Sequence, residues 1–90
     1  MMRIHEFDWD RRNIAHIARH NVQDYEVEEA ILFDKPLYYK SRNNRHVAHG
    51  VSQDGRYLYI VFLVLEPGII RVITARNMSE REKYNYRRQK

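Results

Sequence analysis

The residues of this chain that could do chemistry are arginines, histidines and tyrosines gathered in its second half. Arg71 and Arg76 lie in an apolar segment, and a basic segment that begins at Ser79 follows it directly. A guanidinium stays charged at physiological pH and is costly to bury without a partner. The segment therefore predicts a carboxylate or a phosphate close to these arginines.

Cleavage of RNA without a metal ion requires residues of this kind. A base removes the proton from the ribose 2′-hydroxyl, cations stabilise the charge on the in-line phosphorane, and an acid protonates the leaving oxygen. Tyrosine rings and arginine planes also stack on unpaired bases. The candidates for these tasks are Arg45, His49, Arg71, Arg76, Glu82, Tyr84 and Tyr86.

The same residues also have structural explanations. Arg45 or Arg71 could pair with Glu66 or with a carboxylate of the acidic run described below, and Tyr84 or Tyr86 could pack the last helix against the sheet. Residue chemistry alone leaves both interpretations open.

Other reaction classes find less support in the sequence. There are no cysteines, which excludes thiolate chemistry and disulfides. His16 and His20 have helical i, i+4 spacing but no third metal ligand nearby. The three glycines stand alone, so there is no phosphate-binding loop, and no serine has the context of a nucleophile elbow. We therefore expect no metal and no cofactor.

The charge of the chain is basic and unevenly distributed. Lys plus Arg number 16 against 12 Asp plus Glu, and 12 of the 16 are arginine, the residue suited to bidentate phosphate recognition. Residues 22–34 hold five carboxylates and no lysine or arginine, whereas residues 76–90 hold six basic side chains. Either run can be a solvated helix face; alternatively, the acidic run meets a partner or pairs with the basic tail.

Length and hydropathy predict one domain in the cytoplasm. Ninety residues suffice for a single modest core, here residues 1–90. The first nine residues lack the pattern of a signal peptide, and the longest apolar run, residues 57–65, is half the length of a membrane span. The absence of cysteine is typical of a reducing compartment.

The first third of the chain predicts one strand and two helices. Residues 4–9 alternate as a short strand, with Phe7 and Trp9 as core or interface anchors. Asp8 or Asp10 can cap the helix that follows, and Asp10 and Asn13 are expected to cap or brace it. That helix ends near His20, where Asn21 is a plausible left-handed cap. A second helix starts at Asp24 and ends before Pro36, and its expected inward residues are Val27, Ala30 and Ile31, with Leu32 and Phe33 as further candidates.

Beyond Pro36 the periodicity changes to two. Strands are predicted at residues 37–40, 45–51, 56–65 and 69–76, joined by short turns that include Asp54-Gly55 and Pro67-Gly68. The third of these is apolar on both faces, which predicts a central strand covered on both sides. Ser79 and Glu82 form a capping box for a last helix. The predicted class is α+β, an antiparallel sheet with helices in the order β-α-α-β-β-β-β-α.

Landmarks spread over nearly the whole chain resemble the BrnT family of bacterial type II toxins, small ribonucleases with a RelE-like fold. Departures from the family pattern are Asn21 in place of a glycine, His49 in place of an aliphatic residue, and a short loop before Arg45. The resembling residues are Phe7-Asp8-Trp9-Asp10 with Asn13, Arg19-His20 with Val22, Glu29-Ala30, Phe33 with Pro36, Arg45 before Gly50, Ser52 with Gly55-Arg56, the run from Arg71 to Arg76, and Glu82 with Tyr86.

The resemblance implies a metal-independent endoribonuclease that cleaves RNA and inhibits translation. It also implies a BrnA-like antitoxin with a ribbon-helix-helix domain, and operator DNA bound only through the toxin–antitoxin complex. Under this hypothesis Arg71 and Arg76 bind the phosphate, and Arg45 binds a second phosphate or the leaving-group side. The proton acceptor is His20, His49 or Glu82, and the residues expected to bind RNA are Arg56, Arg81, Tyr84 and Tyr86.

Two other functions use the same positive charge. One is a non-catalytic nucleic-acid-binding or corepressor domain, and the other is a structural protein whose arginines are held in ion pairs. A pure binder leaves RNA intact and binds it in a strongly salt-dependent way, whereas a metal-independent nuclease turns RNA over in the presence of a chelator.

Overall fold

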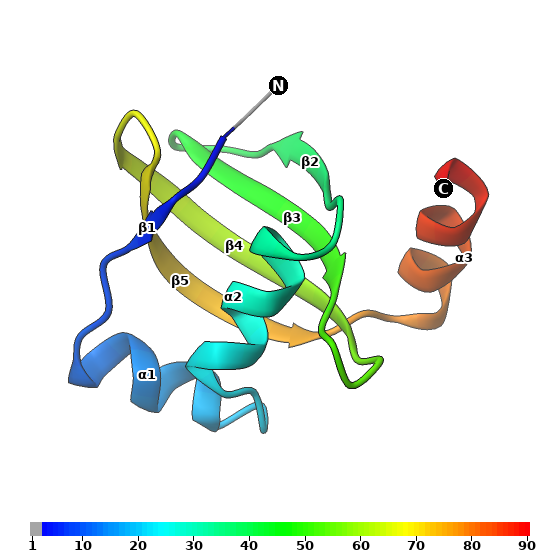
Figure 1. Cartoon of the computed structure of the whole chain (residues 1–90), viewed down its shortest axis with the longest axis horizontal. Helices are drawn as coiled ribbons and strands as arrows, with labels where there is room; N and C mark the ends of the chain where they lie inside the picture. Colours follow the sequence, from blue (N-terminus) through cyan, green and yellow to red (C-terminus); the bar gives the residue numbers. More distant parts are fainter. Residues whose placement is uncertain (1–2) are drawn as a thin grey trace.

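The computed structural model describes residues 3–90, in which three helices and five strands follow one another in the predicted order (Figure 1). Residues 1–2 of the predicted domain lie outside this described part. The elements are β1 (Glu6–Phe7), α1 (Arg11–Ala18), α2 (Asp24–Leu32), β2 (Leu37–Lys40), β3 (Arg45–Val51), β4 (Tyr57–Glu66), β5 (Ile69–Asn77) and α3 (Glu80–Gln89).

All five strands belong to one sheet with the order β1-β5-β4-β3-β2. Strands β2 to β5 form the predicted antiparallel meander, but β1 pairs with β5 in the parallel direction, so the sheet is mixed. The parallel pair arises because the chain leaves β1 through α1 and α2, enters the sheet at its far edge, and returns strand by strand. Only Glu6 and Phe7 of the predicted strand over residues 4–9 pair in this way.

Helices α1 and α2 cover one face of the sheet, and the core lies between them and the strands (Figure 1). On β4 the residues Leu58, Ile60 and Phe62 are fully buried under this layer, while Tyr59 and Val61 between them are only half-buried. The prediction of a central strand is confirmed, but the prediction that both of its faces are covered is wrong. Two short helices cover a single face, and the opposite face is largely open.

The helix ends follow from local hydrogen bonds. Asp10 and Asn13 form a reciprocal capping box at the start of α1, and Ser79 and Glu82 form the predicted one at the start of α3. Asn21 ends the turn after α1 with φ of 60°, as expected for a left-handed cap. The two capping boxes fix where α1 begins relative to β1 and where α3 begins relative to β5.

Helix α2 buries the residues at i, i+3 and i+4, which are Val27, Ala30 and Ile31. The expectation that Leu32 and Phe33 also face inward is wrong, because they are 43% and 69% exposed. Each further residue rotates about 100° around the helix, so these two side chains leave the apolar stripe.

The acidic run is largely satisfied inside the molecule. Glu26 pairs with Arg56, Glu28 accepts from the indole Nε1 of Trp9 at 2.7 Å, and Glu29 accepts from the Gln53 amide at 3.1 Å. Within residues 3–90 no ion pair joins this run to the basic tail. The run and the tail are joined instead by a hydrogen bond from the Tyr86 hydroxyl to the Asp34 carboxylate.

None of the helices in the described part of the chain is long and apolar enough to cross a membrane.

A close approach of α2 to β3 at Gly50 gives the first prediction. A Cβ at residue 50 would lie 2.7 Å from the Ala30 carbonyl oxygen, inside contact distance of helix backbone. Gly50→Ala is expected to lower the free energy of unfolding by about 1–3 kcal/mol through overpacking, as measured by urea denaturation. In the control Gly55→Asn, a Cβ has open space and asparagine tolerates the positive φ, so a change of less than about 1 kcal/mol is expected. Equal losses would contradict the packing argument.

Candidate functional site

The open face of the sheet carries a row of side chains near the start of α3. Strand pairing places His49 of β3 beside Tyr59 of β4, and Tyr59 beside Arg76 of β5. Residues that pair across adjacent strands point to the same face. The row therefore brings a histidine, a tyrosine and an arginine together on three strands.

Arg76 is the most constrained cation of this row. Its Nη1 and Nη2 donate to the two carboxylate oxygens of Glu82 at 2.9 and 3.0 Å, a bidentate pair. Its Cζ lies 3.8 Å from the centroid of the Tyr59 ring, within range of a cation–π contact. The hydrogen bonds raise the pKa of Arg76 and lower that of Glu82, so both remain charged.

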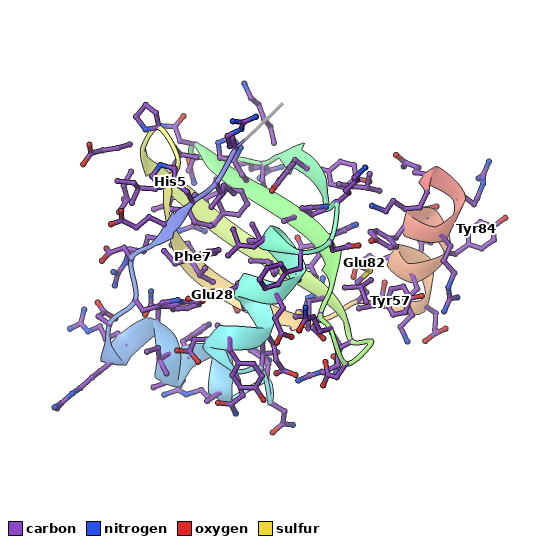
Figure 2. The ribbon with its side chains drawn as sticks, viewed as in Figure 1. His5, Phe7, Glu28, Tyr57, Glu82 and Tyr84 are labelled. Atoms are coloured by element: carbon purple, nitrogen blue, oxygen red, sulfur yellow. The ribbon has the colours of Figure 1, made fainter. Side chains whose placement is uncertain are left out.

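Glu82 occupies this position because α3 begins where it does. The carboxylate also accepts from the Ser79 amide at 2.8 Å, so the capping box and the ion pair share one side chain. Figure 2 shows Glu82 on the side of α3 that faces the sheet. The helix start thus holds the carboxylate over the end of β5.

His49 lies between two tyrosines at the centre of the row. Its ring centroid is 5.0 Å from that of Tyr39 and 5.4 Å from that of Tyr59, and the residue is 8% exposed. Burial lowers the pKa of His49, and the nearby charges of Glu82 and Arg76 act in opposite directions. Nδ1 is buried without a hydrogen-bond partner among the described residues. The imidazole is therefore neutral at neutral pH and can still accept or donate a proton.

A cavity of about 440 Å³ opens beside this row, between the sheet and α3. Its lining combines strand residues with one side of α3, including Tyr39, His49, Tyr59, Glu82, Asn85 and Gln89. We define the arginine site as His49, Tyr59, Arg76 and Glu82 together with this cavity. The site offers a neutral imidazole, a fixed guanidinium and aromatic rings for an anionic ligand with planar groups.

Arg45 and Arg71 belong to a second row at the other end of the open face. Both pair in register with Leu63, which is four residues from Tyr59 on β4, roughly 13 Å away at strand spacing. Arg71 donates to Asp8 at 3.1 Å and to Asp10 at 2.5 Å, and it lowers the pKa of Asp10. The structure thus separates Arg71 from Arg76. The carboxylates that Arg71 binds come from the segment between β1 and α1, and not from Glu66 or the acidic run, which were the expected partners.

Arg56 and Tyr86 have protein partners. Arg56 donates to the Asn21 carbonyl at 2.6 Å, to Glu26 at 2.8 Å and to Asn77 at 3.0 Å, and thus joins three segments. Tyr86 is 5% exposed, and its hydroxyl donates to Asp34 at 2.5 Å. Burial raises the pKa of Tyr86, so the hydroxyl keeps its proton.

The remaining predicted residues are exposed. Arg81 lies on the outer side of α3, and Tyr84 is 61% exposed with Arg88 over its ring at 5.6 Å. His20 follows α1 in the helix layer, where its ring meets that of His16 at 5.9 Å. In residues 3–90 no three side chains of the metal-binding types His, Cys, Asp and Glu are grouped closely enough to hold a metal ion. Because His20 lies in the helix layer and the arginine site lies on the open face, the fold does not bring His20 to that site.

Sequence reasoning missed Tyr39 and Tyr59, which flank His49 on both sides. Their signal was the alternation along each strand, which places both at outward positions. What alternation could not show is the register of the three strands. In the structure His49 pairs with Tyr59 on one side and with Leu37 on the other, and this register brings Tyr39, two residues after Leu37, to the same face as His49. A strand's own residues do not specify its register with a neighbour.

Fold and site together define a class of small basic α+β domain. An open sheet face carries a bidentate Arg–Glu pair, a neutral histidine and tyrosines, closed at one end by a C-terminal helix. This arrangement suits a phosphodiester with exposed bases better than it suits a small apolar ligand.

Residues 9–82 match a family model described as the ribonuclease toxin, BrnT, of type II toxin–antitoxin systems. This match spans most of the chain, which therefore belongs to the BrnT family. A solved structure of similar fold is the Brucella abortus ribonuclease toxin, BrnT, with a TM-score of 0.64 and 18% sequence identity, covering 89% of this chain and 100% of that one. A comparison with curated protein sequences finds no match. The expected family and fold class are confirmed.

The partners of Arg56 and Arg71 give the second prediction. Glu26 is 4% exposed, so Arg56→Ala leaves a buried carboxylate without its cation and is expected to cost about 2–4 kcal/mol of unfolding free energy. In the control Arg71→Ala, the side chains of Asp8 and Asp10 are about half exposed, so a loss of less than about 1 kcal/mol is expected. Chemical denaturation measures both, and the reverse order would contradict the assignment.

Proposed function

We propose that residues 1–90 form one toxin domain that acts in the cytoplasm as a metal-independent endoribonuclease, cleaving RNA and inhibiting translation. Its partner is a BrnA-like ribbon-helix-helix antitoxin, and operator DNA is bound only through the toxin–antitoxin complex. Membership of the BrnT family supports the toxin and ribonuclease class. The observation that carries the metal-independent mechanism is the neutral, buried His49 beside the Arg76–Glu82 pair.

In this mechanism His49 accepts the proton of the ribose 2′-hydroxyl. The resulting alkoxide attacks the adjacent phosphorus, and the phosphorus–oxygen bond to the 5′-oxygen breaks. The leaving oxygen takes a proton from water at the open face. The products are a 2′,3′-cyclic phosphate and a 5′-hydroxyl end, so no external oxidant or metal enters the balance.

Arg76 stabilises the charge that gathers on the phosphorane. Its Nη1 donates to Glu82 and to the Asn77 carbonyl, whereas Nη2 donates to Glu82 and has a second hydrogen for a phosphate oxygen. Glu82 and the Tyr59 ring hold the guanidinium plane before RNA arrives. Such preorganised charge is worth several kcal/mol in a transition state.

The other predicted residues fall into two groups: those on the surface that RNA would follow across the open face and α3, and those with structural roles. Arg45 and Arg71 lie along the open face and suit phosphates of flanking nucleotides, and exposed Arg81 and Tyr84 extend the path onto α3. We assign His20, Arg56 and Tyr86 to structural roles. Their neighbours are protein groups or the helix layer, as described above.

One observation favours the alternative of a non-catalytic nucleic-acid-binding or corepressor domain. The charge of Arg76 is already balanced by Glu82, which is also how a structural ion pair looks. Turnover of RNA separates the two functions, because a binding domain retains RNA without cutting it.

The third prediction tests Arg76 directly. With total RNA in excess EDTA, the purified chain free of its partner is expected to produce fragments, and Arg76→Ala is expected to cut at least about 100-fold more slowly. Its thermal midpoint should stay within a few degrees of the native value, since the pair is partly exposed. Arg12→Ala, an exposed arginine on α1, is the matched control and should cut normally. Intact RNA with the native chain would contradict the proposal.

The fourth prediction concerns pH. His49 must be neutral to accept a proton, and burial lowers its pKa, so cleavage should fall on acidification only at a pH below the one at which an ordinary histidine becomes charged. His49→Asn is expected to cleave RNA about 10²–10⁴-fold more slowly. The part of the fall in rate at low pH that comes from protonation of His49 should be absent in this variant. His46→Asn, on the same strand but facing the helix side, is the control. An unchanged profile in His49→Asn would show that another group takes the proton.

A further inference from the structure

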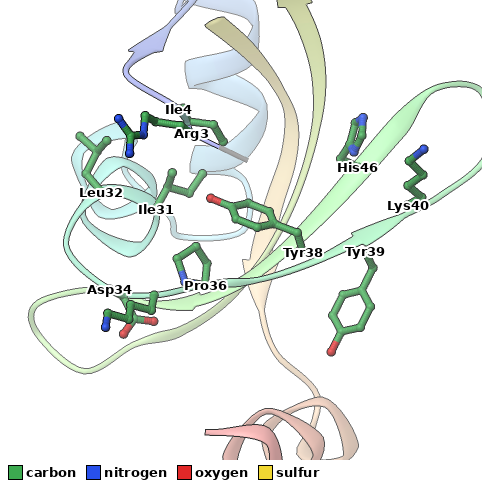
Figure 3. Close-up of a pocket in the computed structure, with 11 residues that line it drawn as sticks. Arg3, Ile4, Ile31, Leu32, Asp34, Pro36, Tyr38, Tyr39, Lys40 and His46 are labelled. Atoms are coloured by element: carbon green, nitrogen blue, oxygen red, sulfur yellow. The ribbon is translucent and has the colours of Figure 1, made fainter. Parts of the chain in front are cut away.

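A second cavity lies on the helix side of the sheet and shares only Tyr39 and Lys40 of the edge strand β2 with the cavity of the arginine site. It has a volume of about 600 Å³ and opens between the end of α2 and the hairpin of β2 and β3 (Figure 3). Tyr38 stands in it and points toward Ile31 and Ile4, whereas Tyr39 points to the other side of β2. We call this cavity the α2 groove.

The floor of the α2 groove is aliphatic and aromatic. Ile4 and Ile31 are nearly buried at its base, and Pro36 and Tyr38 form its wall with Leu32 at the rim. The Tyr38 ring meets Phe62 edge to face at 6.2 Å, which anchors the groove to the core. Leu32 and the adjacent Phe33 are exposed, so an apolar surface continues from the groove onto the end of α2.

The groove exists because the helix layer stops short of one edge of the sheet. Helix α1 packs on β5, and α2 packs on β3 and β4. Strand β2 forms the sheet edge and pairs only with β3. A five-stranded sheet therefore has helices over its middle and one side, and the hairpin edge has room for one more amphipathic segment beside α2.

The rim of the groove is basic. Arg3, Lys35, Lys40 and His46 surround it, and Asp34 is the one carboxylate in the lining. The Asp34 carboxylate already accepts hydrogen bonds from Tyr86 and from the Val51 amide. A ligand in the groove thus meets an apolar floor and a net positive edge.

We propose that the α2 groove binds an amphipathic segment of the antitoxin, with apolar residues on one face and acidic residues along its flanks. The identity of this partner rests on the proposed function, whereas the chemistry of the segment follows from the groove. The apolar face would cover Ile31, Leu32 and Tyr38, and the acidic flanks would pair with Arg3 and Lys35. This places antitoxin binding on the helix side of the sheet, whereas the arginine site lies on the open side.

RNA fits the groove less well. Its floor offers aliphatic side chains, and the Tyr38 ring already packs against Phe62, so stacking planes for bases are scarce. Burial also raises the pKa of Tyr38, consistent with an apolar surrounding. Helix-in-groove binding of a protein segment uses this kind of surface.

The test uses the full chain and a BrnA-like ribbon-helix-helix antitoxin, with affinity measured by titration calorimetry. Two variants change the groove: Leu32→Ser removes an exposed apolar contact, and Arg3→Glu/Lys35→Glu reverses the rim charge at two residues that do not line the cavity of the arginine site. Their matched controls are Leu65→Ser, an equally exposed leucine at the far end of β4, and Arg11→Glu/Arg12→Glu, the same charge change on α1. RNA cleavage in EDTA is measured for every variant.

We expect each groove variant to weaken antitoxin binding by about tenfold or more, with both controls within about threefold. Cleavage by the groove variants should stay near the native rate, and Arg76→Ala should bind antitoxin normally.

Native affinity of both groove variants, with cleavage intact, would overturn the groove assignment and leave the nuclease proposal standing. Lost cleavage with native antitoxin affinity would assign the groove to RNA and also overturn it. A native chain that neither cleaves RNA nor binds the antitoxin would overturn the proposed function itself.

Hydrogen exchange of the complex gives an independent readout. The proposal predicts slower amide exchange in residues 31–40 when antitoxin is bound, with residues 71–77 less affected. Protection confined to the open face would contradict the groove assignment even if an affinity change were seen.

Discussion

The one-sided burial of the sheet is the constraint on which the rest of the structure depends. Only two short helices are available to cover five strands, so alternate residues of each strand meet very different surroundings. On β4, Leu58, Ile60 and Phe62 form the core, and Tyr59 between them is left at the surface. The hydrophobic effect fixes the first set and thereby the direction of the second.

The arginine site is a consequence of this alternation. Once Leu58, Ile60 and Phe62 of β4 are buried, strand pairing brings His49, Tyr59 and Arg76 into one row on the open face. Helix α3 then begins at Ser79, and its capping box places Glu82 over that row. A local helix signal therefore completes a site whose other members come from three strands.

The same shortage of helices explains the α2 groove. The layer over β3, β4 and β5 leaves the β2 edge uncovered, and the apolar stripe of α2 ends before Leu32 and Phe33. In our proposals the two faces then serve two partners. The open polar face meets RNA, and the unfilled apolar edge of the helix layer meets the antitoxin. Separate faces allow each function to be tested without disturbing the other.

The sequence by itself determined the order and type of the elements, the caps of α1 and α3, and the identity of the family. These properties depend on local periodicity, on residues such as Ser79 and Asn21 at helix ends, and on landmarks spread along the chain. Only the tertiary structure decided that Arg71 pairs with Asp8 and Asp10 while Arg76 pairs with Glu82, that β1 joins β5 in parallel, and that Tyr59 flanks His49. The reason is physical: register and face come from contacts between residues far apart in sequence, and a strand's own pattern is equally compatible with several registers.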